Sequence, residues 1–324
     1  MRSQPQCTVI IPTYNRARLL GLTLASLTRQ SLPGDSFEVV VVDDGSSDET
    51  AAVVDEYRDR LRLQYFFQPD EGFRAAAARN TGIRHAGGGV CVFADSGMLL
   101  HGDFVRAHLD AHAAPGGPVA VVGYNYGHKQ DASGTWALED ELDVDDPSGT
   151  IGRLAGRPQW RDIREPFWAK YGDEFHHLPA PWLVFWAGNI SVPTEQLHRV
   201  GLFDEAFRSW GGEDLDLGYR LHRAGVPIVL SRAATAVHLP HDKSEAANES
   251  AANGNYRYMA GKYGTPITRL LPLFPAINPF TMNDWIRDLA LPSCAEYLDR
   301  GPAGAGAEVG AAAGAGAVAA RADR

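Results

Sequence analysis

The sequence predicts an α/β protein with a doubly wound, mostly parallel sheet, flanking helices and a C-terminal extension. Short apolar runs rich in β-branched residues alternate with helical repeats within the first hundred of the 324 residues. Polar side chains follow several of these runs directly. That is the expected position of ligand-binding groups, because ligands of parallel sheets bind beyond the carboxyl ends of the strands.

The first half of the chain gives the clearest elements. Residues 8–12 predict a strand, and leucines at helical spacing predict a helix over 16–30. The run at 37–42 is typical of a strand covered on both faces. The remaining elements expected here are a helix from Ser47 or Asp48 to about residue 61, a strand at 62–67, a helix at 73–86 and a strand at 90–94.

The second half is less regular. Residues 125–180 are rich in Pro, Gly and Trp and predict a long excursion from the sheet. A helix is expected near 213–224 and a strand near 226–230. The apolar, Pro-rich stretch at 265–298 either wraps the domain or touches a membrane surface, and wrapping is the simpler interpretation. From residue 301 the chain is almost all Ala and Gly, which predicts disorder.

Bulk composition excludes several classes of function. A formal net charge of -10 argues against nucleic acid as a partner. The cysteines are three, far apart and without a Cys-x-x-Cys pair, which argues against a disulfide scaffold or structural zinc site. We find neither a leader sequence nor a run of about 18 apolar residues, so a cytoplasmic protein without a membrane span is expected.

Several segments in a fixed order carry a family resemblance. Residues 9–16 read VIIPTYNR, 41–48 read VVDDGSSD, 72–82 read GFRAAAARNTG and 201–205 read GLFDE. Together they resemble family 2 glycosyltransferases. The stretch WGGEDLDLGYRL at 210–221 is similar to that of bacterial chondroitin polymerases and animal β-1,4-galactosyltransferases. The resemblance covers roughly 7–245 and implies a GT-A fold, a nucleotide-sugar donor and inversion at the anomeric carbon.

The same resemblance assigns the catalytic base to Asp214. Inverting transfer needs one base beside the acceptor hydroxyl, and a carboxylate at a helix start next to two glycines suits that task. Its neighbour Glu213 points elsewhere and is expected to bind an acceptor hydroxyl. Trp210 and Trp186 are expected on the acceptor side, since aromatic rings cover the C–H faces of sugars. Trp186 and Trp182 are equally compatible with the core.

Donor-binding residues are expected at the ends of the first strands. Asp44 matches the family aspartate that binds uracil, which favours a UDP-sugar, and Pro12 and Tyr14 line the same pocket. Either Arg74 or Arg79 reaches the diphosphate, with a slight preference for Arg79. Two further donor-binding residues follow from the resemblance, namely Asp95 and Gly188.

The metal site departs from the family pattern. The usual Asp-x-Asp becomes Asp95-Ser96-Gly97, so the second carboxylate is missing. His238 stands where chondroitin-type relatives place a metal ligand, and His241 follows three residues later. We expect Asp95, His238 and His241 to hold Mn²⁺ or Mg²⁺, imidazole favouring Mn²⁺. A cation supplied by Arg or His, or plain loop histidines, are the alternatives.

These assignments divide the chain into predicted parts. Residues 1–264 form the GT-A domain, with a nucleotide-binding half at 1–100 and an acceptor-side half at 101–264. Residues 265–300 form a wrapping extension, through which peripheral membrane contact is the other hypothesis, and 301–324 a disordered tail. The predicted partners are a UDP-sugar and an acceptor hydroxyl of a natural product or glycan. Competing hypotheses are a catalytically inactive binding protein and, more weakly, a nucleotidyltransferase.

Overall fold

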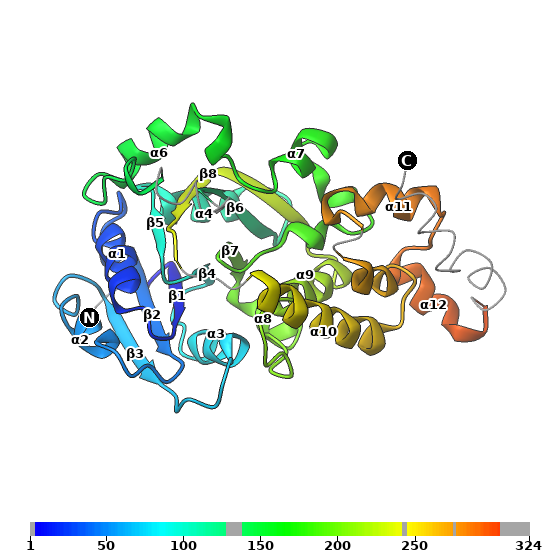
Figure 1. The fold of residues 1–324 in the computed structure, drawn as a ribbon, viewed down its shortest axis with the longest axis horizontal. Helices are drawn as coiled ribbons and strands as arrows, with labels where there is room; N and C mark the ends of the chain where they lie inside the picture. Colours follow the sequence, from blue (N-terminus) through cyan, green and yellow to red (C-terminus); the bar gives the residue numbers. More distant parts are fainter. Residues whose placement is uncertain (1–3, 128–137, 242–244, 275–276, 305–324) are drawn as a thin grey trace.

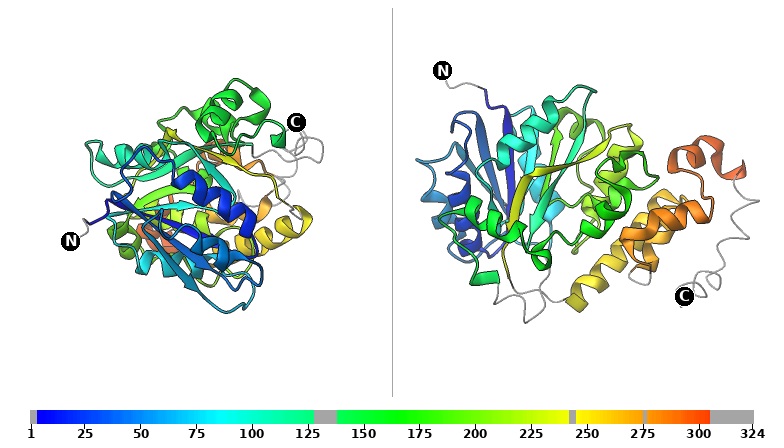
Figure 2. Two further views of the ribbon diagram at one scale, coloured as in Figure 1. Left: turned by 90° about the vertical axis from the view of Figure 1, so that its left-hand side faces the viewer. Right: turned by 90° about the horizontal axis from the view of Figure 1, so that it is seen from above.

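The computed structural model describes residues 4–127, 138–241, 245–274 and 277–304. In this part of the chain, one sheet in the order β3-β2-β1-β4-β7-β6-β8-β5 carries helices on both faces (Figures 1 and 2). The strands are β1 (Cys7–Thr13), β2 (Phe37–Asp43), β3 (Leu63–Phe67), β4 (Val90–Ala94), β5 (Met98–Leu100), β6 (Ala120–Tyr126), β7 (Asn189–Pro193) and β8 (Ile228–His238). The predicted α/β class with a mixed, mainly parallel sheet is confirmed.

Helices cover the sheet and continue beyond it. The α-helices are α1 (Ala17–Leu27), α2 (Thr50–Asp55), α3 (Ala75–Arg84), α4 (Phe104–Ala113), α6 (Pro147–Ala155), α7 (Glu165–Tyr171), α8 (Thr194–Arg199), α9 (Glu213–Arg223), α10 (Glu245–Tyr263), α11 (Met282–Asp288) and α12 (Cys294–Gly304). Short 3-10 helices are η1 (Pro158–Trp160), η2 (Phe175–His177), η3 (Pro181–Val184), η4 (Thr268–Leu273) and η5 (Pro279–Thr281). None of the helices in the described ranges is long and apolar enough to cross a bilayer.

Strands β1 to β4 form the parallel half of the sheet. Every residue of β2 is buried, because helices lie on both faces and the strand is apolar on both. Helix α3 packs closely on β1 on one face: a side chain on Gly82 would come within 2.4 Å of Ile10. Leu20 and Leu24 of α1 join the core on the other face. The strand ends of this half therefore meet at one rim.

Strand β5 closes the sheet in an unexpected way. It begins only three residues after β4, yet it pairs antiparallel with β8 at the far end of the strand order. Met98 lies opposite His238, and the amide of Leu239 donates to the carbonyl of Gly97 at 2.8 Å. The sheet thus curls so that its last strand returns beside the end of β4.

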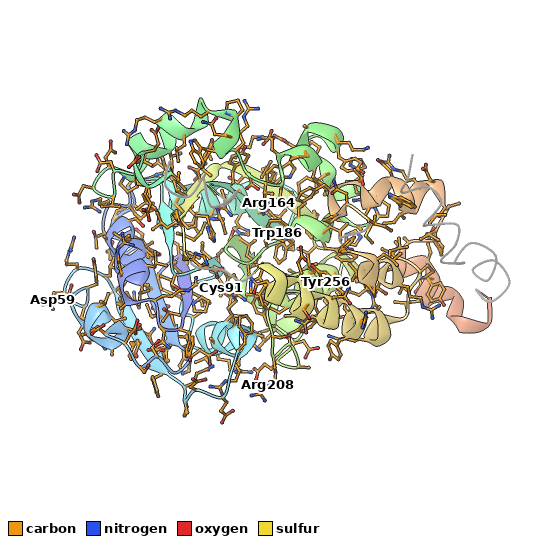
Figure 3. All side chains as sticks on the ribbon, viewed as in Figure 1. Asp59, Cys91, Arg164, Trp186, Arg208 and Tyr256 are labelled. Atoms are coloured by element: carbon orange, nitrogen blue, oxygen red, sulfur yellow. The ribbon has the colours of Figure 1, made fainter. Side chains whose placement is uncertain are left out.

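The excursion between β6 and β7 is fixed by a buried ion pair. Arg164 and Asp162 are 0% and 1% exposed and lie 2.7 Å apart. The Arg164 guanidinium also donates to the carbonyls of Gly123 and Val184, at 2.9 and 3.0 Å. One side chain therefore joins the excursion to β6 and η3, and Figure 3 labels it near Trp186.

The C-terminal extension packs on the domain. Leu270, Leu271 and Phe274 are buried in the largest hydrophobic cluster. The Asn283 side chain accepts a hydrogen bond from the Ala180 amide at 2.9 Å and donates to the Ala180 carbonyl at 3.3 Å. Several apolar side chains of this segment are therefore buried inside the protein.

Three boundaries differ from those expected. Strand β8 covers 228–238 instead of ending near 230, because its second half pairs with β5 and continues along β6 past a register shift. Helix α2 ends at Asp55, well before residue 61. Helix α12 extends to Gly304, so the segment expected to be disordered is helical at its start. Residues 305–324, the rest of that expected tail, lie outside the described residues.

Candidate active site

Two neighbouring aspartates end β2 and have different surroundings. Asp43 accepts hydrogen bonds from the amide of Ser46 and the hydroxyl of Tyr65, both at 2.7 Å, and so braces the turn. Asp44 is 7% exposed, accepts from the amide of Arg74 at 2.8 Å and lies 3.2 Å from the Arg74 guanidinium. Arg74 therefore pairs with Asp44 directly after β2.

Tyr14 lies at the same rim because β1 and β2 are neighbours. Its ring is 46% exposed, and its hydroxyl donates to Asp70 at 2.9 Å. This hydrogen bond raises the pKa of Tyr14, since the carboxylate stabilises the protonated phenol. Pro12 is partly exposed beside it. An open aromatic face next to a carboxylate that can accept N–H groups suits a flat heterocyclic base.

Arg79 lies inside the protein between two carboxylates. One terminal nitrogen donates to Glu213 at 2.8 Å and the other to Asp95 at 3.0 Å. The side chain is only 6% exposed, and the two carboxylates hold its pKa above the ordinary arginine value although burial alone would lower it. Each terminal nitrogen thus bonds one carboxylate and keeps a second N–H group.

The start of α9 presents the acidic pair. Gly212 is its N-cap in the left-handed region at φ 98°. Glu213 is buried, and its second oxygen, Oε2, has no hydrogen-bond partner. Asp214 is partly exposed and accepts from the amides of Leu215 at 2.8 Å and Ala187 at 3.3 Å. Burial, and then the charge of Glu213, raise the pKa of Asp214 to about 7. Such a carboxylate can take up a proton near neutral pH.

Gly188 and Asp95 adjoin each other across β4 and β7. A side chain on Gly188 would come within 3.2 Å of an Asp95 oxygen, and the Asp95 amide lies 3.4 Å from the Gly188 carbonyl. Glycine therefore leaves room beside the Asp95 carboxylate, which is 39% exposed. Ala187, directly before Gly188, donates its amide to Asp214. Asp95, Gly188 and Asp214 therefore lie close together.

The two predicted histidine ligands lie next to each other at the end of β8. Their rings are 5.1 Å apart, centre to centre. Nδ1 of His241 is 3.2 Å from the carbonyl of Leu239, an acceptor, so this nitrogen carries the proton. Pairing of β5 with β8 brings His238 to the Asp95 turn. Across the ranges that the structure describes, no group of three or more such side chains forms a metal cluster by itself.

The aromatic residues separate into core and surface. Trp182 is fully buried and belongs to the core. Trp186 is partly exposed, and its ring lies 5.2 Å from the Arg164 guanidinium. Trp210 is 48% exposed directly before the two glycines that precede α9. Trp210 thus presents an exposed ring, Trp186 is half-buried, and Trp182 is part of the core.

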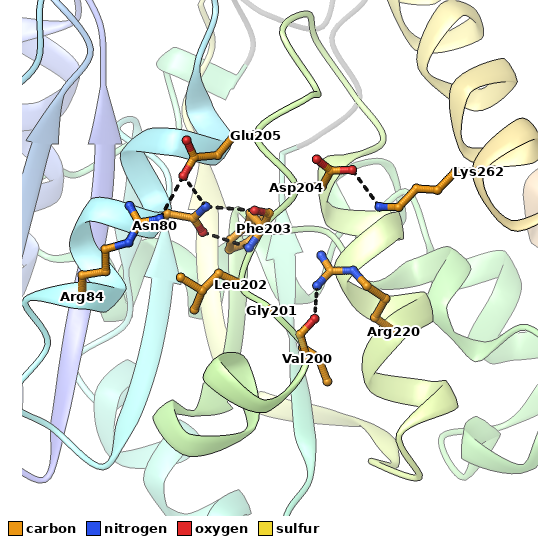
Figure 4. Close-up of a pocket in the computed structure, with 10 residues that line it drawn as sticks. All are labelled: Asn80, Arg84, Val200, Gly201, Leu202, Phe203, Asp204, Glu205, Arg220 and Lys262. Atoms are coloured by element: carbon orange, nitrogen blue, oxygen red, sulfur yellow. Dashed lines mark hydrogen bonds and ion pairs between the residues drawn. The ribbon is translucent and has the colours of Figure 1, made fainter.

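A separate cavity of about 400 Å³ lies behind α3 (Figure 4). It contains none of the residues expected to bind the donor, and its charged side chains pair with one another, for example Arg84 with Glu205 and Lys262 with Asp204. Asn80 exchanges two hydrogen bonds with the backbone of Phe203, at 2.8 and 2.9 Å. This region joins α3 to the loop before α9 and does not resemble the catalytic crevice.

Two residues in the crevice were not predicted from the sequence. Arg16, in the turn after β1, is partly buried; burial lowers its pKa, and the charge of Asp95 opposes that effect. Tyr256, labelled in Figure 3, has its pKa raised by burial and then by the charges of Asp214 and Glu213. The sequence contains a signal for Arg16, because it is a cation directly after the first strand. It contains none for Tyr256, whose position near Asp214 and Glu213 is seen only in the folded structure.

Comparison with known proteins identifies the family. A model described as glycosyl transferase family 2 matches residues 8–167, and one described as N-terminal domain of galactosyltransferase matches 173–242. The uncharacterized glycosyltransferase YfnE of Bacillus subtilis is 30% identical over 297 residues, which is 85% of this chain and 74% of the relative. The chain belongs to glycosyltransferase family 2. The predicted recognition and the predicted enzyme class, glycosyltransferase, are confirmed at the level of the family.

Other relatives of this family 2 glycosyltransferase are longer. Validoxylamine A glucosyltransferase of Streptomyces hygroscopicus subsp. jinggangensis is 42% identical over 249 residues, 76% of this chain and 58% of that protein. The chain thus spans little more than half of that relative. Among solved structures, Staphylococcus aureus TarS 1-349 in complex with UDP-GlcNAc matches with a TM-score of 0.57 and 19% identity, covering 82% and 66% of the two chains. Pyrobaculum calidifontis mannosyltransferase PcManGT, in complex with GDP-Man and Mn²⁺, matches with a TM-score of 0.53 and 21% identity, covering 98% and 79%. These structures share the fold.

Proposed function

We propose that the chain transfers a hexose from a UDP-sugar to an acceptor hydroxyl with inversion, and that Asp214 is the general base. The carrying observation is the position of a partly exposed carboxylate at the first turn of α9, bonded to the amide of Ala187 beside Gly188 and the Asp95 rim. Its raised pKa supports the same role. A base with a pKa near the working pH is efficient, because it is deprotonated before the reaction and basic enough to accept a proton during it.

The reaction balances with this one base. Asp214 takes the proton of the acceptor hydroxyl while that oxygen forms a bond to the anomeric carbon. The bond from this carbon to the diphosphate oxygen breaks, and its electron pair leaves with the nucleoside diphosphate. Attack opposite to the leaving group inverts the anomeric configuration.

The donor's base is proposed to lie on Tyr14 and Pro12, with Asp44 accepting the uracil N–H. The exposed Tyr14 ring and the Asp44 carboxylate at one rim support this arrangement. One relative is named as a glucosyltransferase, and one structural neighbour was solved in complex with UDP-GlcNAc. Both support a nucleotide-sugar donor of the UDP type. For the diphosphate we propose Arg16 together with Arg79, whose terminal nitrogens each bond one carboxylate and each keep a second N–H group.

We propose Asp95, His238 and His241 as ligands of a divalent cation, although the described residues do not already form a cluster of three such groups. One carboxylate, Asp95, stands at the turn that β5 and β8 bring to His238 and His241. Three protein groups of this kind would hold Mn²⁺ more readily than Mg²⁺, because two of them are imidazoles. When bound, the cation would offset the negative charge of the diphosphate. PcManGT, a neighbour in fold, was solved with GDP-Man and Mn²⁺.

The acceptor is proposed to be a small polyhydroxylated natural product or a glycan. Glu213 supports this, because its buried Oε2 has no partner and can accept a hydrogen bond from an acceptor hydroxyl. The exposed ring of Trp210 and the partly exposed ring of Trp186 can cover apolar sugar faces. The 42% identical relative is named for a glucosyl transfer to validoxylamine A, which favours a natural-product acceptor.

We further propose residues 1–264 as the catalytic domain and 265–300 as an extension wrapped onto it. The buried side chains of η4 support the wrapping. The cysteines that the structure describes are all unpaired and buried, which agrees with a reducing cytoplasm as the location.

The decisive test compares wild type with Asp214→Asn. The two proteins should bind a UDP-sugar alike in a thermal-shift titration, whereas kcat should fall about 10²–10⁴-fold in the variant. Product stereochemistry, read by NMR of the anomeric proton, should show inversion. Equal turnover by the two proteins, or retention of configuration, would remove Asp214 from the role of base.

A further inference from the structure

Helix α10 lies against the turn that precedes the catalytic helix. A side chain on Gly211 would come within 3.3 Å of Ala252, and one on Gly212 within 3.3 Å of Asn255. Both glycines have positive φ, 86° and 98°, so the turn follows a path that other residues rarely adopt. The family model that matches the α9 region ends at 242, before α10 begins.

Asn255 holds this turn through its side-chain amide. Its Nδ2 lies 3.0, 3.3 and 2.6 Å from the carbonyl oxygens of Ser209, Trp210 and Gly211. Its Oδ1 accepts a hydrogen bond from the Ser209 hydroxyl at 3.2 Å. The residue is 9% exposed. Carbonyls of a left-handed turn lie outside any helix or strand ladder, so a buried side chain that satisfies them fixes the path of the backbone.

This turn sets the start of α9. Gly212 is the N-cap, and its carbonyl accepts the amide of Asp216 at 2.9 Å, which makes the first helical hydrogen bond. Asp214 lies within this first turn, and Trp210 lies directly before the glycines. A shift of the Gly211 and Gly212 backbone therefore moves the carboxylate and the exposed indole together.

We infer that Asn255 is a positioning residue for catalysis, acting through the turn of Gly211 and Gly212 to aim Asp214 and Trp210. The inference rests on the proposed function in one respect, the role of Asp214 as base. It makes α10, from outside the segments that the family models match, a part of the catalytic machinery. The energetic logic is that a base displaced by about 1 Å costs on the order of 10²-fold in rate.

The chain offers a matched control on the same helix. Asn253 also donates from its side-chain amide to backbone carbonyls, those of Pro272 at 3.2 Å and Phe274 at 3.4 Å. It therefore ties α10 to the C-terminal extension instead of the catalytic turn. Asn253→Ala and Asn255→Ala remove the same chemical group from the same helix. The first frees the backbone at 272–274, and the second frees the backbone at 209–211.

The experiment measures turnover, donor binding and amide hydrogen exchange in the full chain. Asn255→Ala should lower kcat about 100-fold while the Kd for UDP-sugar changes less than about twofold. Exchange should accelerate at 209–216 in this variant and at 270–274 in Asn253→Ala, whose kcat should stay within about threefold of wild type. Asn255→Ser keeps one donor group and should give an intermediate kcat; it replaces the Ala variant if that variant does not fold.

The possible failures are distinguishable. Unchanged exchange at 209–216 in the Asn255 variants would show that this side chain does not hold the turn. Faster exchange there with wild-type kcat, or equal loss of kcat in the Asn253 variant, would show that the held turn does not position the base. If wild type transfers no sugar to any acceptor, the proposed function fails, and the exchange data alone then decide whether Asn255 fixes the turn.

Discussion

Arg79 donates a hydrogen bond to Glu213 across 2.8 Å, and both side chains are less than a tenth exposed. The second terminal nitrogen of Arg79 bonds Asp95 at 3.0 Å. One buried cation therefore joins α3, the turn after β4 and the start of α9. It lowers the cost of placing several carboxylates in one crevice, because a buried anion without a partner is strongly destabilising.

Replacing this cation should be costly. Arg79→Met leaves Glu213 buried and unpaired, and the free energy of unfolding in urea should fall by about 3–5 kcal/mol. Arg84→Met is the control, since Arg84 and its partner Glu205 are 52% and 45% exposed and such pairs contribute about 0–1 kcal/mol. Equal losses in the two variants would contradict a structural role for the buried cation.

The pH dependence of transfer should depend on Glu213. A general base works deprotonated, so kcat/KM should rise with pH through the pKa of Asp214, near 7. Glu213 is the second cause of that raised pKa. Glu213→Gln removes the like charge and should move the acid limb of the kcat/KM profile to lower pH. It should also raise the KM for the acceptor. Glu205→Gln changes a carboxylate away from Asp214 and should leave the acid limb of the profile in place. A shift of that limb to higher pH in Glu213→Gln would contradict the inference that the charge of Glu213 raises the pKa of Asp214.

A buried histidine pair predicts sensitivity to acid. His108 bonds Ser191 and Asn189, both at 2.9 Å, and His112 bonds the same Ser191 at 2.8 Å. Burial lowers the pKa of His108 to about 3 and that of His112 to about 4. Both are therefore neutral when folded and take up protons when unfolded, once the pH falls below their ordinary pKa of 6.5.

Protonation of these histidines in the unfolded chain makes the folded protein less stable in acid. The unfolded chain binds more protons between pH 6.5 and about 4, so stability is full above pH 6.5 and is lost as the pH falls through that window. Each imidazole contributes a slope of up to about 1.4 kcal/mol per pH unit. Urea unfolding at several pH values should show that the free energy of unfolding changes less steeply with pH in His112→Gln than in wild type. His176 is exposed, so His176→Gln is the control. Identical slopes in all three proteins would exclude the pair as the origin.

Metal dependence can be assigned ligand by ligand. If Asp95, His238 and His241 hold the cation, EDTA should abolish turnover and Mn²⁺ should restore it better than Mg²⁺. His238→Ala and His241→Ala should each raise the Mn²⁺ concentration for half-maximal activity by about tenfold or more. His101→Ala is a control histidine outside the rim. Full activity in EDTA would instead favour Arg16 as the cation at the leaving group.

Local patterns predicted the parallel half and its polar rim, because β-branched runs and helical spacing are local properties of the chain. The ends of β1, β2 and β4 bring Tyr14, Asp44 and Asp95 to one rim, as the pattern of strands and polar residues predicted. The contacts of Arg79 and Asn255 could not be predicted in this way. Glu213 lies 134 residues from Arg79, and the carbonyls that Asn255 binds lie 44–46 residues from it, and no local pattern encodes such distances.

The same limit applies to β5. It is only three residues long, and its partner β8 lies more than a hundred residues later. A strand this short has no recognisable period, so its place at the far edge of the sheet emerges only from the curl of the whole sheet. That curl is what carries His238 to Asp95.

The three-residue connection from β4 to β5 has a mechanical consequence. It links two strands that lie far apart in the strand order, so a short stretch of chain ties the end of β4 to the edge strand β5 and, through it, to β8. An insertion of even one residue in that connection is therefore expected to shift β5 and β8 against β4, and with them His238 against Asp95.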